Sequence, residues 1–329
     1  MSERKNASIL FEKGLITEQQ FGKIKEHASS GIFSLHNEIR FFLFLSVLLF
    51  TSGAGIFIYN NIESIGHVAV LTIIFLITAI CFLYSFKHGK GFSKQKISSE
   101  NPAYDYLVLA ANVLLGIFIG YAQFQYNLFG TRYGLATLVP TALYFFSAYY
   151  FDHKGVLSLA ISGLFAAVGF STSPQAIFQI HFSGDNELGF SVLFLGVALI
   201  LWTLYAARSQ LKEHFNATFL NFALHVISII AVVNLIEYYS FAWFVYLLIV
   251  AAVLLYFIRL AYQKASINFL TFSLIYAYII FNILLSKLIS MSGAYMFIIY
   301  LSPFYFIGSI LFFRKCIKDF KIKTRNAGI

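Results

Sequence analysis

One histidine stands where an ionisable side chain is rare. His225 lies inside the apolar run 217–236, and it is the only ionisable residue expected near the middle of a bilayer. Ionisable groups at that depth are costly and usually mark a proton relay or a ligand site. Thr218, Asn221 and Ser228 share its helix face. The alternative is structural, because a neutral histidine has one donor and one acceptor that Asn221 could satisfy.

Two further apolar runs, 104–123 and 267–285, carry polar stripes at helical spacing. At 100° per residue, Asp105, Asn112, Gly116 and Gln123 fall within about 40° of one face. A looser stripe contains Asn268, Thr271, Tyr278, Asn282 and Ser286. Such residues either bond to a neighbouring helix, typically ~0.6 kcal/mol per pair, or line a polar cavity. Positions 219 and 223, away from the His225 stripe, are expected to face lipid.

Recognised catalytic motifs are not found in the chain. There is no His-Glu-x-x-His zinc motif, no phosphate-binding P-loop and no Gly-x-Gly-x-x-Gly fingerprint. The remaining histidines are scattered, and Cys81 and Cys316 lack metal-site spacing. We therefore expect no enzymatic activity, no metal and no cofactor.

Composition shows which elements must hold these side chains. The 329 residues are 59% hydrophobic and only 11% charged, whereas a soluble domain has roughly 25% charged residues. A spanning helix needs about 20 apolar residues. Ten such runs occur, near 39–59, 65–86, 104–123, 133–151, 155–171, 188–207, 217–236, 241–261, 267–285 and 293–313. The fifth is short, so a re-entrant segment is the alternative there.

Lysine and arginine predict the orientation of these spans, because such residues collect in cytoplasmic loops. With the N-terminus inside and the spans alternating, all 23 basic residues except Arg132 and Lys287 fall on the inner side. Both termini are therefore expected in the cytoplasm. The net charge of +9 then indicates contact with an anionic inner leaflet, worth about 1 kcal/mol per well-placed basic residue, and not with nucleic acid.

The N-terminus predicts a small helical hairpin. Gly14 tolerates the left-handed conformation that ends a helix. Thr17 and Gln20 have the spacing of a capping box, and Ile16 and Phe21 that of a hydrophobic staple. This unit packs on its own membrane domain or docks a partner protein.

A family resemblance rests on the same residues. The hairpin "EKGLITEQQFGKI", followed by the span "LLFTSGAGIFIYNNIESIGH", resembles the bacterial membrane proteins grouped as domain of unknown function 2157. There, a short helical hairpin precedes a polytopic bundle. The likeness covers roughly residues 8–86; the tryptophan usual after the first span is replaced here by Asn61. The resemblance implies a bacterial cytoplasmic membrane and supplies no catalytic residues.

Together these features predict an all-α, polytopic transmembrane bundle of about ten spans with a short cytoplasmic N-terminal hairpin. The expected domains are the hairpin 1–38, the membrane domain 39–313 and a basic cytoplasmic tail 314–329. The first functional hypothesis is a non-enzymatic scaffold or accessory subunit that docks through its hairpin. The alternative is a carrier of a small neutral or amphipathic solute or lipid, with a cavity lined by spans three, seven and nine. The sequence leaves the oligomeric state open.

Overall fold

A computed structural model describes residues 11, 16–29, 66–97, 102–172, 186–237, 241–292 and 295–326, with single positions 49, 53, 56, 60 and 63. The chain divides into two units, Met1–His67 and Val68–Ile329. The first predicted span, 39–59, and Gly14 of the hairpin lie outside the continuously described ranges.

The N-terminal unit contains helix α2, Glu18–Ser29. Both hydrogen bonds of the predicted capping box are present. The Gln20 N–H donates to Thr17 Oγ1 at 3.4 Å, and the Thr17 N–H donates to Gln20 Oε1 at 2.9 Å. The ring of Phe21 stacks on that of Phe11, with 4.8 Å between centroids. Local sequence therefore sets where this helix begins.

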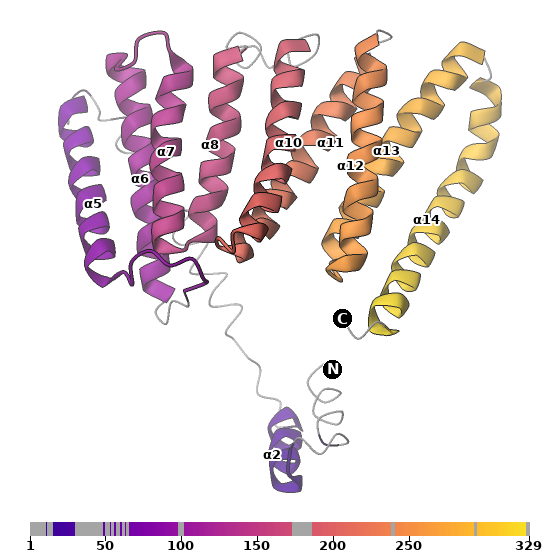
Figure 1. The fold of residues 1–329 in the computed structure, drawn as a ribbon, viewed down its shortest axis with the longest axis horizontal. Coiled ribbons are helices and arrows are strands. Elements are labelled where there is room, and N and C mark those ends of the chain that lie inside the picture. Colours follow the sequence, from indigo (N-terminus) through magenta and orange to yellow (C-terminus); the bar gives the residue numbers. More distant parts are fainter. Residues whose placement is uncertain are drawn as a thin grey trace. The chain divides into compact units, whose positions relative to one another are not determined.

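Every regular element described in the second unit is a helix (Figure 1). Their bounds are α5 His67–His88, α6 Pro102–Tyr126, α7 Tyr133–Phe151, α8 Lys154–Thr172, α10 Asn186–Arg208, the short 3-10 helix η1 Glu213–Phe215, α11 Asn216–Glu237, α12 Phe241–Gln263, α13 Ile267–Ser292 and α14 Tyr295–Asn326. Predicted spans two to ten each coincide with one long helix. The last helix continues to Asn326, so most of the predicted tail is helical.

Within the described residues, seven helices are long and apolar enough to cross a membrane: α5, α6, α8, α10, α11, α12 and α13. Helix α7 has the predicted bounds and contains Pro140 and four tyrosines, and it is not among the seven. Helix α14 combines an apolar first part with a basic second part. The fifth predicted span is the unbroken 19-residue helix α8. Large apolar side chains remain exposed along these helices, as expected of surfaces that face lipid.

Helix α11 has the most buried position of the seven. It packs against α8, α10, α12 and α13. Phe219 and Ala223 are buried in this core, so the prediction that positions 219 and 223 face lipid was wrong. A helix with four neighbours has no broad lipid-facing side on which to place them.

Glycines set the close contacts between neighbouring helices. A Cβ on Gly116 of α6 would overlap the Tyr144 hydroxyl of α7, and a Cβ on Gly163 of α8 would overlap Thr141 of α7. Gly116 therefore allows α6 and α7 to approach closely. Gly120, one turn further along α6, meets no atom within 4 Å of an added Cβ and makes no such contact.

The helices alternate in direction. The connections from α5 to α6, α7 to α8, α10 to α11 and α12 to α13 therefore lie at the end where α14 finishes (Figure 1). We call this the basic end, because its described lysines and arginines include Lys87, Lys90, Lys94, Lys96, Lys154, Arg208, Lys212, Arg259 and Lys264.

Candidate functional site

Three segments distant in sequence meet at the basic end. They are the 89–97 loop after α5, the turn at 152–153 between α7 and α8, and the 209–215 connection from α10 to α11. Asp152 ends α7 in the left-handed conformation, at φ 58°, which aspartate tolerates better than most residues. Lys212 has a similar φ of 46°, and its N–H donates to the Lys94 carbonyl at 2.8 Å.

Asp152 connects all three segments through its carboxylate. Oδ1 lies 3.0 Å from Lys212 Nζ and 2.6 Å from His214 Nε2. Oδ2 accepts a hydrogen bond from the Ile97 N–H. We call Asp152, Lys212 and His214 the Asp152 cluster. Its aspartate and lysine side chains are 1% and 0% exposed, so both charges have been withdrawn from water.

Aromatic rings surround the lysine of this cluster. Lys212 Nζ lies 5.8 Å from the centroids of both the Phe92 and Phe215 rings, within the range of cation–π attraction. A buried ion pair adds little net stability, but removing one partner costs about 3–5 kcal/mol, because it leaves a bare charge inside. The cluster therefore specifies how the three segments fit together.

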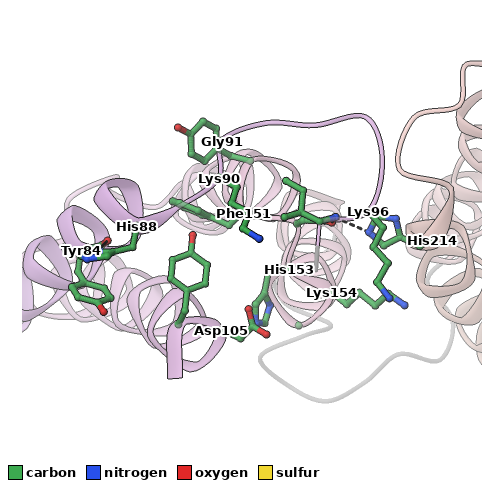
Figure 2. A pocket seen from close by; sticks show the side chains of 15 residues that line it. Tyr84, His88, Lys90, Gly91, Lys96, Asp105, Phe151, His153, Lys154 and His214 are labelled. Carbon is green, nitrogen blue, oxygen red and sulfur yellow. Dashed lines mark hydrogen bonds and ion pairs between the residues drawn. The ribbon is translucent and has the colours of Figure 1, made fainter. Parts of the chain in front are cut away.

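A pocket of about 650 Å³ adjoins the Asp152 cluster (Figure 2). It lies at the ends of α5, α6, α7 and α8 and is lined by Lys90, Lys96, Lys154, His88, His153, His214, Asp105 and Asp152, together with aromatic side chains. The sequence suggested that these histidines are scattered, but the fold brings three of them to one cavity. Within the described part of the chain, no three His, Cys, Asp or Glu side chains are placed to hold a metal ion.

His153 and Asp105 lie side by side in this pocket (Figure 2). Burial lowers the pKa of His153, and the neighbouring Asp105 carboxylate offsets part of that effect. His153 Nδ1 accepts the Val156 N–H at 3.1 Å, in the first turn of α8. A neutral imidazole thus satisfies a donor that a helix start leaves unpaired. Asp105 lies in the first turn of α6, at the basic end of that helix.

The remaining polar residues of that span contact α7 and the loop that precedes it. Asn112 is fully buried, and its Nδ2 donates to Ser147 Oγ of α7 at 2.9 Å. Gln123 Nε2 donates to the Gly130 carbonyl at 2.8 Å, and its Oε1 accepts the Phe129 N–H at 2.8 Å. The stripe therefore joins neighbouring parts of the bundle and does not line one cavity.

His225 contacts α13. Its Nδ1 lies 3.0 Å from the Tyr276 hydroxyl, and its ring meets Phe272 edge-on at 4.6 Å. We call His225 and Tyr276 the His225 pair. The expected bond to Asn221 was wrong: both residues are on α11, but the imidazole turns toward the neighbouring helix. Ser228 is fully buried, and its Oγ has no hydrogen-bond partner in the described structure.

The last predicted stripe joins α13 to α14. The Tyr305 hydroxyl donates to Asn282 Oδ1 at 3.1 Å, and Asn282 Nδ2 donates to the Tyr278 carbonyl at 2.7 Å. Tyr278 stacks on Tyr305 with 6.0 Å between centroids. A cavity of about 450 Å³ lies beside Tyr278, Asn282 and Lys287. Spans three, seven and nine are helices α6, α11 and α13, and each presents its polar residues to a different neighbour.

Comparison with known proteins agrees with this membrane architecture. Residues 9–157 match the family of predicted membrane proteins called DUF2157. The resemblance inferred from the hairpin is thereby confirmed, and the protein is a membrane protein with multiple candidate spans. No curated protein and no solved structure matches the chain.

The DUF2157 match includes Asp152 and the pocket residues of α5, α6 and α7, whereas Lys212 and His214 lie beyond it. Sequence reasoning missed the Asp152 cluster. It counted Lys212 among the basic residues that set orientation, and it gave Asp152 no role. The available signal was weak: a carboxylate in the "FDHK" turn and cations in "LKEHF", two loops expected on the same side.

Proposed function

We propose that this protein is a non-enzymatic membrane scaffold or accessory subunit that docks a partner protein through its N-terminal hairpin. In this proposal the chain has ten spans and both termini are cytoplasmic. The observation that carries it is the pairing of Asn112, His225 and Asn282 with side chains of adjacent helices, which occupies polar groups that a transport pathway would need.

The basic end supports the proposed orientation. The alternating helices gather four basic connections there, and the positive-inside tendency places such connections in the cytoplasm. Alkaline phosphatase fused after Glu63, Asp185 or Lys287 should be active, and the same enzyme fused after Lys94 or Lys212 should be inactive. Inactive fusions at Asp185 and Lys287 would contradict the ten-span topology.

The hairpin supports docking, because it presents apolar area. Phe11 is 39% exposed although it stacks on Phe21, and Gln19 and Lys23 of α2 are exposed nearby. Exposed aromatic rings next to polar residues are common at protein interfaces.

Site-specific photo-crosslinking in cells tests docking. A photoreactive side chain at position 19 or 23 should crosslink to one defined protein, and Phe21→Ala should weaken that crosslink. The matched control places the same group at exposed position 264 in the turn after α12. Crosslinking only to lipid, or equally from the hairpin and position 264, would overturn the scaffold proposal.

A carrier remains the second candidate because of one observation, the 450 Å³ cavity that includes Asn282 and Ser286. Cysteines at 282 and 286, in a chain lacking Cys81 and Cys316, should react with water-soluble thiol reagents if this cavity belongs to a pathway. Phe281 and Leu288 are 54% and 64% exposed on the same helix and provide controls expected to face lipid. Equal, negligible labelling at all four positions would exclude the carrier.

A further inference from the structure

The pocket at the basic end has cations that its own carboxylates do not neutralise. The carboxylate of Asp152 already contacts Lys212, His214 and the Ile97 N–H. Asp105 lies beside His153. Lys96 and Lys154 are exposed at the pocket, and neither forms an ion pair with a carboxylate of the described chain.

The positions of these two lysines favour an anion with several oxygens. Their side chains come from different segments, the 89–97 loop and the start of α8, and reach toward the same side of the pocket (Figure 2). Lys154 is also the first residue of α8, and the positive end of a helix dipole attracts negative charge. Like charges brought together in this way repel unless an anion lies between them.

The other wall of the pocket is aromatic. Tyr84, Tyr150 and Phe151 line it beside the charged residues, and tyrosine is common at the depth of lipid head groups. The pocket opens at the ends of helices whose outer surfaces expose large apolar side chains. A molecule with a phosphate at one end and hydrocarbon at the other matches both walls.

We propose that this pocket binds a phosphate group held between Lys96 and Lys154. A phospholipid head group and a free phosphate share this chemistry. The aromatic wall favours the lipid. This inference goes beyond the scaffold proposal, which is tested at the hairpin, so either can fail without the other.

The test uses the purified full-length protein in a neutral detergent. Phosphatidylglycerol, phosphatidylcholine and inorganic phosphate are titrated in turn, and binding is followed by native mass spectrometry and by the thermal unfolding midpoint. Lys96→Gln with Lys154→Gln should weaken phosphatidylglycerol binding roughly thirtyfold, as expected for the loss of two basic contacts of about 1 kcal/mol each. Lys87→Gln with Lys264→Gln makes the same charge change elsewhere on the basic end and should change binding less than about twofold.

Asp105→Asn provides a change of opposite sign. It removes the carboxylate nearest His153 and should tighten phosphatidylglycerol binding a few-fold, because repulsion of the phosphate is lost. All the substituted lysines are exposed, so the variants should fold, and an unchanged elution volume would verify this.

The lipid arms identify the source of the phosphate. Selective binding of phosphatidylglycerol, lost in the Lys96/Lys154 variant, supports a lipid head group. Binding of inorganic phosphate with the same dependence on these lysines, and no gain from lipid, supports a soluble phosphate ligand. Equal weakening in both double variants, or unchanged binding in the Lys96/Lys154 variant, would overturn the pocket and indicate only diffuse attraction by the basic end.

Discussion

The Asp152 cluster and the His225 pair both hold a histidine against an oxygen atom, but in different surroundings. In the cluster, a carboxylate that is 1% exposed meets a lysine that is fully buried, and it joins three segments. In the pair, a half-buried imidazole meets one hydroxyl across two adjacent helices. The buried charges of the Asp152 cluster would be the costliest to leave unpaired. They lie in the connections between helices, away from the middle of the bundle. The Asp152 cluster depends on how three segments fold together. The His225 pair depends only on the rotation of α11 and α13 about their own axes.

The largest effect should come from breaking the Asp152 cluster. Asp152→Ala leaves Lys212 buried without its counter-charge, and we expect a loss of about 3–5 kcal/mol in the free energy of unfolding. Unfolding of the detergent-solubilised protein can be followed by tryptophan fluorescence, since Trp202 and Trp243 lie in α10 and α12.

The double variant Asp152→Ala with Lys212→Met separates the bare charge from lost packing. It should recover most of the stability, because no unpaired ammonium remains inside. If the double variant is as unstable as Asp152→Ala alone, the cost does not come from the buried charge.

A smaller effect is expected at the His225 pair. His225→Leu roughly keeps the side-chain volume but leaves the Tyr276 hydroxyl without its partner, so the protein should lose about 1 kcal/mol. His225→Asn retains a donor and an acceptor and should be closer to wild type.

Tyr276→Phe tests whether the two residues act together. In a double-mutant cycle, His225→Leu and Tyr276→Phe should be less than additive, as contacting residues are. Additive losses would show that the observed 3.0 Å contact contributes nothing to stability.

The smallest effect concerns pH and His153. Its pKa is lowered by burial, so the unfolded chain takes up a proton more readily than the folded chain. Stability from neutral His153 should therefore be intact above about pH 6.5 and decline as pH falls below that value. Protonation of Nδ1 would also remove the acceptor for the Val156 N–H.

His153→Asn retains a short-range acceptor for α8 and cannot titrate, so it should flatten this part of the pH profile. Thermal midpoints measured from pH 8 to pH 5 for both proteins provide the comparison. Parallel curves would show that another group causes any loss of stability in acid.

Local patterns made most of the helices predictable. The run predicted at 133–151 coincides with α7, Tyr133–Phe151, because about 20 apolar residues between polar loops leave little choice of boundary. The capping box at Thr17 and Gln20 was also predictable from local sequence, because both of its hydrogen bonds join residues three apart.

Partners across the fold were not predictable in this way. Helical spacing places His225 on a face of α11, but it does not identify Tyr276 on α13 as the neighbour. Nor does it show that α11 is surrounded, which is why positions 219 and 223 were misplaced. Asp152 binds residues 55 and 62 positions away in the chain, and no periodicity in one sequence encodes such pairings.

The separation of these partners has a consequence for biogenesis. Asp152 emerges from the ribosome well before Lys212 and His214. Its carboxylate therefore has neither of these partners until α8 and α10 have been synthesised. Closure of the cluster then ties the loop after α5 to the connection before α11, through Ile97 and Lys94. The cluster can therefore form only after α8 and α10 have taken the correct orientation. If α8 or α10 were inverted, Lys212 would lie at the opposite end of the bundle from Asp152, and the cluster could not form.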